Sequence, residues 1–256
     1  MKFVALTCLL VIACAAEPSD EVAGDNLGDE SGGGGGKDDS YGLSGRTCAA
    51  GATTQGIDVS YFQGTIDWSA VHAAGIEFAF IRLSYGDVFR DPKFDRNWPA
   101  AKAAGVVRGA YQFFRPSDDV ASQADMMIEA IGTYEPGDLP PVLDVEKTDG
   151  YSPAQIASRV RTWVDRVHAA LGVEPIIYTG SYFWRDHVGG AKGYDTDPLW
   201  IAQYTSQCPN LPLPWHAWAF WQHSNVGRIA GITGRVDLDT FDGSVADLRT
   251  FAGSAY

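Results

Sequence analysis

From residue 56 onward, the chain alternates short apolar runs with longer amphipathic stretches, and this alternation constrains the fold more than any other feature. Runs rich in the β-branched and aromatic residues that strands favour occur at 56–62, 78–86, 106–114, 140–146 and 174–180. Stretches with helical spacing separate them, at 67–75, 92–105, 117–132 and 152–172. The first of these begins with an aspartate cap, Asp67, and the third opens with the capping residues 117–119. Such alternation is typical of βαβ units and predicts a parallel sheet.

The stretch 152–172 carries the clearest helix signals. Ser152 and Pro153 provide an N-cap and a first-turn proline, Gly172 follows the last turn, and the apolar residues between them recur at helical spacing. After about residue 190 this signal fades, and three further strand-like runs follow at 198–205, 217–224 and 234–241. Eight strands and about five helices in roughly 200 residues predict one closed α/β barrel with an irregular last third.

The first 14 residues have the features of an export signal. A lysine at position 2 precedes an apolar run over 3–13, which is too short to span a bilayer as a stable helix. The end of this run, LVIACAAE, resembles the lipobox of bacterial lipoproteins, which predicts that Cys14 becomes the lipidated first residue of the mature protein. An ordinary signal peptide, cleaved beside the small residues Ala13 and Ala15, is the alternative. The protein is therefore expected to be exported, either as a membrane-anchored lipoprotein or as a secreted protein.

Residues 15–47 are rich in glycine, serine and acidic residues and contain almost nothing to bury. We therefore expect a disordered tether there, followed by a single folded domain over 48–256. The formal net charge of −13 argues against nucleic acid as a partner. A monomer is the default expectation, and contact with a membrane is expected only through a lipid on Cys14.

Two cysteines remain in the predicted domain. Cys8 lies in the export signal and Cys14 at its end, which leaves Cys48 and Cys208. In an exported protein we expect these two to form a disulfide between the start of the domain and a late loop, with two unpaired thiols as the alternative. The five histidines are scattered and no cysteine pair has metal-ligand spacing, so no metal site is predicted.

Asp144 and Glu146 stand two positions apart at the end of the apolar run 140–146. If this run is a buried strand, both side chains share one face, with Cβ atoms about 6 to 7 Å apart. Two like charges at this distance perturb each other's ionisation, and one carboxyl group can then keep its proton near neutral pH. The pair is therefore typical of an acid catalyst. Acidic residues that close a strand and face water are the alternative.

Acidic and aromatic side chains gather at the predicted strand ends, where the chemistry of such barrels takes place. The acidic residues are Asp58, Asp144, Glu146, Asp237 and Asp239, and the aromatic residues are Tyr61, Tyr85, Tyr111, Phe113, Tyr178, Trp200, Tyr204, Trp218 and Trp221. One aromatic residue alone is more often part of a core, but together they predict a wall that can stack on sugar rings. A carboxyl pair in an aromatic trough suits cleavage of a glycosidic bond.

Eight motifs occur in the order and approximate spacing of the glycoside hydrolase family 25 lysozymes, also called the Chalaropsis type: GIDVSYFQGTIDW, FAFIRLSYG, GAYQFF, LDVE, IIYTG, LWIAQY, WQHS and VDLDTF. The resemblance spans roughly residues 55–252. It implies an N-acetylmuramidase with an irregular, flattened (β/α)5(β)3 barrel similar to a TIM barrel. Such an enzyme cleaves the β-1,4 bond between N-acetylmuramic acid and N-acetylglucosamine in peptidoglycan glycan strands. No metal or organic cofactor is implied.

The resemblance also implies roles for single residues. Glu146 matches the general acid, and Asp144 matches a residue that orients or polarises the 2-acetamido group of the substrate. Asp58 and Asp237 match the other two acidic positions of the cleft. The family often has asparagine where this chain has Asp239, and on its own we expect Asp239 to be a solvated loop residue. The substrate-binding residues expected around these acids are Tyr61, Tyr85, Tyr111, Phe113, Tyr178, Trp200, Tyr204, Trp221 and Asp239.

The stereochemical course and two other functions stay open. Retaining and inverting reactions require carboxyl separations of about 5 to 5.5 Å and about 6.5 to 9.5 Å, which sequence spacing does not distinguish. The resemblance favours participation of the substrate's own 2-acetamido group. A non-catalytic glycan-binding barrel is one alternative, although the four acidic positions are intact. A hydrolase of another N-acetylglucosamine polymer, such as chitin, is the other.

Overall fold

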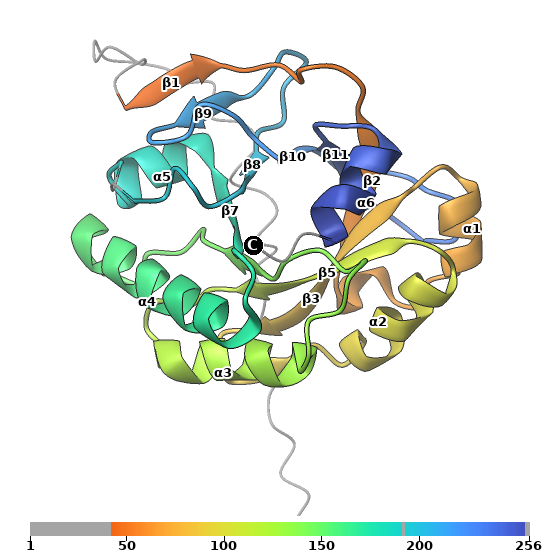
Figure 1. Cartoon of the computed structure of the whole chain (residues 1–256), viewed down its shortest axis with the longest axis horizontal. Coiled ribbons are helices and arrows are strands. Elements are labelled where there is room, and N and C mark those ends of the chain that lie inside the picture. Colours follow the sequence, from red (N-terminus) through yellow and green to blue (C-terminus); the bar gives the residue numbers. More distant parts are fainter. Residues whose placement is uncertain (1–41, 191–192, 254–256) are drawn as a thin grey trace, which may run out of the picture.

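Eight strands close into a barrel in the computed structural model, which describes residues 42–190 and 193–253 (Figure 1). They are β2 (Thr54–Val59), β3 (Phe78–Tyr85), β5 (Val107–Phe113), β6 (Val142–Asp144), β7 (Ile176–Gly180), β8 (Leu199–Ala202), β10 (Phe220–Gly227) and β11 (Val236–Phe241). The order around the ring is β2, β11, β10, β8, β7, β6, β5 and β3, and a pairing of β2 with β3 closes it. Neighbouring strands are parallel except at β11, which is antiparallel to both β10 and β2.

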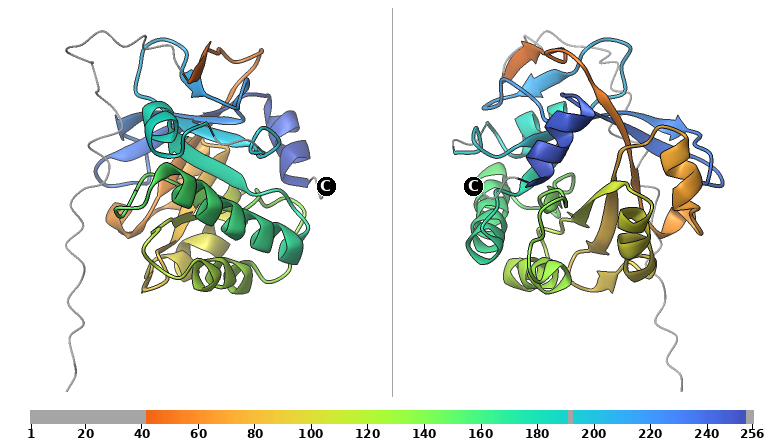
Figure 2. Two further views of the ribbon diagram at one scale, coloured as in Figure 1. Left: turned by 90° about the vertical axis from the view of Figure 1, so that its left-hand side faces the viewer. Right: turned by 45° about the vertical axis from the view of Figure 1, so that its right-hand side comes forward.

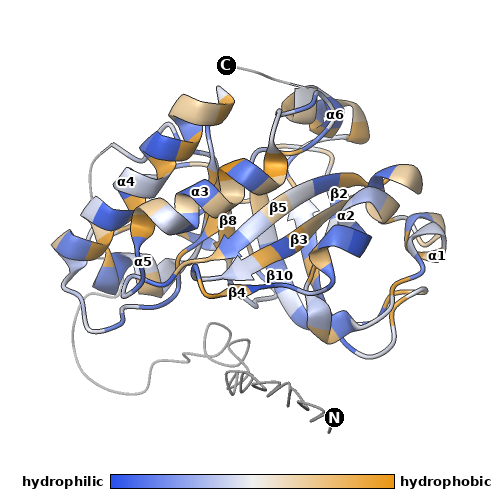
Figure 3. Cartoon of the chain, turned by 90° about the horizontal axis from the view of Figure 1, so that it is seen from below, coloured by the Kyte–Doolittle hydropathy of each residue, from blue (hydrophilic) through white to orange (hydrophobic). Residues whose placement is uncertain are grey.

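Each of the first five barrel strands is followed by a helix that lies outside the barrel. These helices are α1 (Trp68–Ala73), α2 (Phe94–Ala103), α3 (Val120–Ile131), α4 (Pro153–Leu171) and α5 (Ser181–His187). Helices α3 and α4 pack side by side, and each of them carries both polar and apolar residues (Figures 2 and 3). Five βα units followed by three further strands confirm the predicted (β/α)5(β)3 barrel.

The predicted helix caps are present in the structure. Asp67 and Asp119 accept hydrogen bonds from backbone N–H groups of the first turns of α1 and α3. Ser152 forms a capping box with Gln155 at the start of α4, and Gly172 ends this helix in the left-handed region, at φ 71°. These local signals account for the accuracy of the helix predictions.

The barrel wall separates two apolar cores. Alternate residues of β3 show the division, because Phe78 and Phe80 point into the barrel while Ile81 and Leu83 pack under the helices. Inside, the ring of Phe80 stacks on Trp200 with centroids 4.2 Å apart. A Cβ atom at Gly109 would lie 2.6 Å from the Phe80 ring, so this close approach requires glycine. Aromatic rings therefore fill the centre of the barrel.

A last helix, α6 (Val245–Gly253), closes the end opposite the open one. The sequence predicts no helix there, yet Ser244 and Asp247 exchange hydrogen bonds at its start in the manner of a capping box. Leu248 and Ala252 insert into the inner core. Phe251 packs against the rings of Phe220 and Phe241, at centroid distances of 5.6 and 5.7 Å.

A small two-stranded sheet covers one side of the barrel. It shows that the predicted start of the folded domain, residue 48, is too late. Strand β1 (Leu43–Arg46) pairs antiparallel with β9 (Asn210–Pro212), although its residues were assigned to the tether. The folded domain thus begins before residue 48. The correction has a physical reason, since an edge strand can form through backbone hydrogen bonds to a distant partner without apolar side chains of its own. The export signal, Cys14 and the rest of the tether lie outside the described residues.

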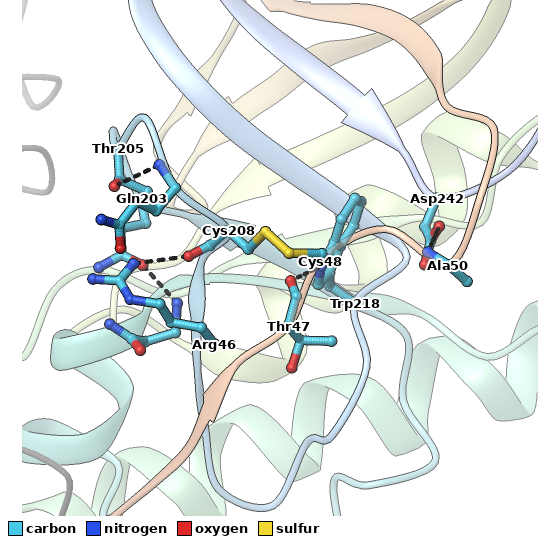
Figure 4. Close-up of a disulfide and its surroundings, with 11 residues drawn as sticks. Arg46, Thr47, Cys48, Ala50, Gln203, Thr205, Cys208, Trp218 and Asp242 are labelled. Atoms are coloured by element: carbon cyan, nitrogen blue, oxygen red, sulfur yellow. Dashed lines mark hydrogen bonds between the residues drawn. A yellow bond between two sulfur atoms is a disulfide. The ribbon is translucent and has the colours of Figure 1, made fainter.

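A disulfide between Cys48 and Cys208 holds this small sheet in place, as predicted (Figure 4). Its Cα atoms are 4.9 Å apart, and 160 positions separate the two cysteines in sequence. Arg46 donates to the carbonyl oxygen of Cys208, and the indole N–H of Trp218 donates to the carbonyl oxygen of Thr47. Disulfide and hydrogen bonds together fix the first described residues to the segment between β8 and β9.

Candidate active site

Four acidic side chains meet at the open end of the barrel, here called the mouth. Asp58 lies near the end of β2, Asp144 is the last residue of β6, and Glu146 follows two residues later. Asp237 comes at the start of β11 rather than at its end, because this strand runs antiparallel to its neighbours. Asp237 is paired with Asp58 in the ladder between β11 and β2.

Side-chain alternation directs the Asp144 and Glu146 side chains to the same side of the wall. Val142 belongs to the inner core, whereas Leu143 and Val145 belong to the outer one. Asp144 therefore points inward two positions after Val142, and Glu146 continues the same series. Strand β6 ends at Asp144, but the backbone N–H of the next residue, Val145, still donates to the carbonyl oxygen of Tyr178 on β7. The structure thus brings the two carboxyl groups onto one face, as the sequence predicts.

Burial raises the pKa of each of these acids. The pKa of Glu146 rises to about 8, mainly because its carboxyl group is desolvated; Lys147 opposes this rise and Asp237 adds to it. Burial and the nearby charge of Asp58 raise the pKa of Asp237 to about 8 as well. Burial, Glu146 and Asp58 raise the pKa of Asp144 well above its usual range. The mouth can therefore hold protonated carboxyl groups at neutral pH.

Asp58 ionises at a lower pH than Glu146 and Asp237, and the hydrogen bond from Gln222 is the largest effect that keeps its pKa down. Burial raises the pKa of Asp58 to about 6, and the hydrogen bond from Gln222 limits that rise. The Gln222 amide donates to Asp58 Oδ2 at 2.7 Å, and its own oxygen accepts from the hydroxyl groups of Tyr178 and Tyr204, at 2.9 and 3.0 Å. Gln222 is buried on β10 and was not predicted from the sequence.

Arg82 is a second functional candidate that was not predicted. Its side chain points inward from β3 and is buried, and its Nε donates to Asp91 Oδ2 at 3.2 Å. The guanidinium charge lowers the pKa of both Asp58 and Asp144. Its carbon lies 5.0 Å from the centroid of the Tyr61 ring, in a cation–π contact. Arg82 therefore offsets part of the negative charge at the mouth.

Several predicted aromatic residues line the mouth or the wall just below it. Tyr61 is part of a 3-10 helix, η1 (Tyr61–Gln63), and stacks on the exposed ring of Phe62 at 4.3 Å. Tyr85 stacks on Phe113 at 4.5 Å, close to the short strand β4 (Phe89–Arg90), which pairs with the end of β3. The remaining members on this side are Tyr111, Tyr178 and Tyr204, whose pKa is raised by burial and further by the acids of the mouth.

Two predicted substrate-binding tryptophans lie elsewhere. Trp200 is buried in the inner core below the acids, where its ring contacts Phe80 and Tyr178. Trp221 faces the outer core, and its indole donates to the carbonyl oxygen of Gln203. Trp221 is adjacent to the inward residue Gln222, so alternation directs it out of the barrel. The expectation that all these rings converge on one mouth is therefore wrong for Trp200 and Trp221. It is also wrong for Trp218, which is buried in the outer core and donates to the carbonyl oxygen of Thr47.

Asp239 is fully buried, which contradicts the expectation of a solvated loop residue. It lies on β11 two positions after Asp237 and shares its inward face. The indole N–H of Trp200 donates to Asp239 Oδ1 at 2.9 Å, while Oδ2 is buried, accepts no donor from the described residues and interacts with the carboxyl group of Asp58. Asp239 therefore lies beneath the acids of the mouth rather than on the surface that a ligand would contact.

Over residues 42–190 and 193–253, no group of three or more histidine, cysteine, aspartate or glutamate side chains is arranged to hold a metal ion. The prediction that no cofactor is needed stays a prediction. What the site offers is a set of carboxyl groups with unequal pKa values, enclosed by aromatic rings. Such a set can donate one proton and present one negative charge at the same pH.

Comparisons with known proteins show what this chain is similar to. The family model described as "Glycosyl hydrolases family 25" matches residues 57–232. "Lysozyme M1" of Streptomyces globisporus is 36% identical over 210 residues, which cover 78% of this chain and 71% of the relative. The "Uncharacterized protein YegX" of Escherichia coli K12 is 37% identical over 204 residues, which cover 78% and 73%. The crystal structure of a lysozyme from Streptomyces coelicolor superimposes with a TM-score of 0.74 at 33% identity, covering 80% of this chain and 99% of that one.

Proposed function

Because the chain belongs to family 25 of the glycosyl hydrolases, it is a peptidoglycan hydrolase of the lysozyme type, and we propose that Glu146 is the general acid of its reaction. One observation carries this assignment. Glu146 stands at the mouth with a pKa of about 8, so that it is mostly protonated at neutral pH, while Asp58, with a pKa of about 6, is mostly ionised. Unequal pKa values of this kind separate the acid from the anions in glycosidases.

The scissile bond is proposed to be the β-1,4 bond between N-acetylmuramic acid and N-acetylglucosamine. Glu146 would donate its proton to the glycosidic oxygen as this bond breaks, which turns a poor alkoxide leaving group into an alcohol. Burial and, to a smaller extent, Asp237 keep the proton on Glu146 in the free enzyme by raising its pKa. Loss of this proton at alkaline pH would stop the reaction.

Asp144 is proposed to orient the 2-acetamido group of the substrate. Its side chain is buried on the same face as Glu146, and within the described residues its Oδ1 has no hydrogen-bond partner. An amide N–H of the substrate would satisfy this acceptor. A carboxylate that accepts a hydrogen bond from the amide N–H makes the acetamido oxygen more nucleophilic. This supports attack of that oxygen on the anomeric carbon.

Asp58 and Asp237 are proposed to stabilise the positive charge that develops on the sugar ring. They form a ladder pair on adjacent strands, where opposed Cα atoms are about 4.5 to 5.5 Å apart, and so they present neighbouring carboxyl groups at the mouth. An oxocarbenium-like transition state benefits from the Asp58 anion more than the neutral ground state does, and its positive charge favours ionisation of Asp237, which is mostly protonated in the free enzyme. Tyr61, Tyr85 and Tyr204 would bind the sugar rings and hydroxyl groups beside them.

The export signal and the lipid anchor concern residues outside the described part of the chain. A hydrolase of the cell wall acts outside the cytoplasm, so the protein is an exported one. We propose that Cys14 is lipidated and that residues 15–41 form the tether to the folded domain. In the described ranges, no helix combines the length and the apolar character needed to cross a bilayer. Mass spectrometry of the mature N-terminus would distinguish a lipidated Cys14 from an ordinary cleavage product.

The decisive experiment is digestion of purified peptidoglycan followed by mass spectrometry of the released fragments. Fragments that end in reducing N-acetylmuramic acid are expected, and reducing N-acetylglucosamine would contradict the assigned bond. Chitin digested in parallel tests the other polymer, and binding to wall material without release would indicate a glycan-binding barrel. Proton NMR of the first-formed anomer gives the stereochemical course. Retention is expected, and inversion would exclude acetamido participation.

A further inference from the structure

Asp239 is held rigidly beneath the mouth. Its side chain is completely buried, and its Oδ1 accepts the indole N–H of Trp200 at 2.9 Å. The Trp200 ring is itself fixed between Phe80, on which it stacks, and Tyr178, which it meets edge to face. Asp239 therefore has little freedom to turn towards solvent or a ligand.

The other oxygen of Asp239, Oδ2, is buried, accepts no donor from the described residues and interacts with the carboxyl group of Asp58. Ionised carboxyl groups only accept hydrogen bonds, so a hydrogen bond between these two groups requires that one of them carries a proton. One proton shared between a carboxylic acid and a carboxylate would give Oδ2 a partner. A pair of two anions buried side by side would repel each other strongly.

The surroundings decide which partner keeps the proton. Asp58 accepts a hydrogen bond from Gln222 and lies in the field of Arg82, and both favour its anion. Asp239 has the indole of Trp200 as its one donor among the described residues and is the more deeply buried of the two. Burial raises the pKa of Asp239 well above its usual range, and the charges of Asp58 and Asp237 raise it further.

We propose that Asp239 stays protonated and donates its hydrogen bond to Asp58, which makes it a positioning residue that holds Asp58 as an anion facing the mouth. The proton-sharing pair is independent of the reaction, whereas its effect on catalysis rests on the proposed function. The carboxyl group gives this position a donor to Asp58 and an acceptor for Trp200 at once. An asparagine side chain could supply the same two hydrogen bonds without a titratable proton.

Other charged and titratable groups also face this pair. From the strands and loops around it they are Asp237 on β11, Asp144 and Glu146 at the end of β6, Arg82 on β3, Tyr111 on β5, Tyr178 on β7 and Tyr204 after β8. Three of these groups are carboxylic acids, and each of them that ionises disfavours a second anion beside Asp58. Arg82 opposes them by favouring the anion of Asp58.

Infrared difference spectroscopy of the whole protein at pH 7 tests the pair without any substrate. A protonated carboxyl group absorbs at higher wavenumber than a carboxylate, so Asp239→Asn should remove one band of this kind, and Asp58→Asn should leave it in place. Glu129→Gln, an exposed acid on α3, is the matched control and should not affect the band. An unchanged spectrum in Asp239→Asn, or loss of the band in Asp58→Asn instead, would overturn the proposal.

Activity on peptidoglycan gives an independent readout. Asp239→Asn imitates the protonated acid and should keep kcat/KM within about threefold of the wild type at neutral pH. Asp239→Leu removes the donor to Asp58 and should lower kcat/KM by about tenfold or more and move its acid limb to higher pH, as expected for a lost hydrogen bond to a charged group. A large loss in Asp239→Asn would contradict a protonated Asp239. If the wild type itself released no fragments, the proposed function would fail. The infrared result would still show whether Asp239 is the protonated member of the pair.

Discussion

Gln222 on β10 and Asp58 on β2 are joined by a hydrogen bond of 2.7 Å that spans the intervening strand β11. The amide oxygen of Gln222 accepts from Tyr178 and Tyr204, which leaves its N–H free to donate to Asp58. Two tyrosine hydroxyl groups thus fix the orientation of the amide. The ionisation of an acid at the mouth therefore depends on residues from four barrel segments.

Replacing Gln222 by leucine should move the acid limb of activity to higher pH. The hydrogen bond from Gln222 lowers the pKa of Asp58, so its loss should raise this pKa above about 6 and protonate Asp58 near neutrality. At pH 6 we expect kcat/KM to fall by about tenfold or more, with a smaller loss at pH 8. The measurement is a pH profile of fragment release from peptidoglycan.

Tyr204→Phe is the matched control for this variant. It removes one of the two hydroxyl groups that orient Gln222 and leaves the one from Tyr178. Its acid limb should move less than that of Gln222→Leu. Equal shifts in the two variants would mean that Tyr204 itself, rather than the amide of Gln222, controls Asp58.

Glu146→Gln should lose most of the activity at every pH. An amide has no proton to give to the leaving group, and general acid catalysis contributes about 10²- to 10⁴-fold to the rate. In the wild type, kcat/KM should decline as pH rises through about 8, because Glu146 then loses its proton. Fragment release by the variant and by Glu129→Gln as control checks both statements, and wild-type rates in Glu146→Gln would refute the assignment.

The same substitution should stabilise the protein at alkaline pH. The folded state raises the pKa of Glu146 from 4.5 to about 8, so it binds the proton more tightly than the unfolded chain does. Stability from this group is complete below about pH 4.5 and is lost as pH rises towards 8. Glu146→Gln should therefore raise Tm by roughly a few degrees at pH 8 and leave it nearly unchanged at pH 4. Thermal unfolding at the two pH values would show this difference, and an equal Tm at pH 8 would contradict it.

Local patterns account for the part of the fold that was predicted correctly. The caps at Asp67, Asp119 and Ser152 are set by residues close in sequence, and the alternation of Val142, Leu143 and Asp144 places the acid pair on one face. Strand β1 escaped prediction because its pairing with β9 depends on residues more than 160 positions away, while its own composition resembles the tether.

The direction in which side chains point from each strand determines the part of the site that was not predicted from the sequence. The strands of Gln222 and Arg82 carry no sequence signal that marks these two residues as functional. They belong to the mouth because their side chains point into the barrel. Counting inward positions from Phe220 would have placed Gln222 inside and Trp221 outside. Likewise, an inward Asp237 implies an inward Asp239, but its depth follows from the antiparallel direction of β11, which carries the chain away from the mouth after Asp237.

The disulfide between Cys48 and Cys208 should contribute substantially to stability. It closes a long loop, with 160 positions between its ends, and so restricts the unfolded chain; typical disulfides contribute about 2 to 4 kcal/mol. The double substitution Cys48→Ser and Cys208→Ser should lower the free energy of unfolding by this amount, as measured by urea denaturation. A reducing agent should destabilise the wild type similarly and leave the variant unchanged. Equal unfolding midpoints for variant and wild type would show instead that the β1–β9 pairing and the hydrogen bond of Trp218 suffice to hold this region.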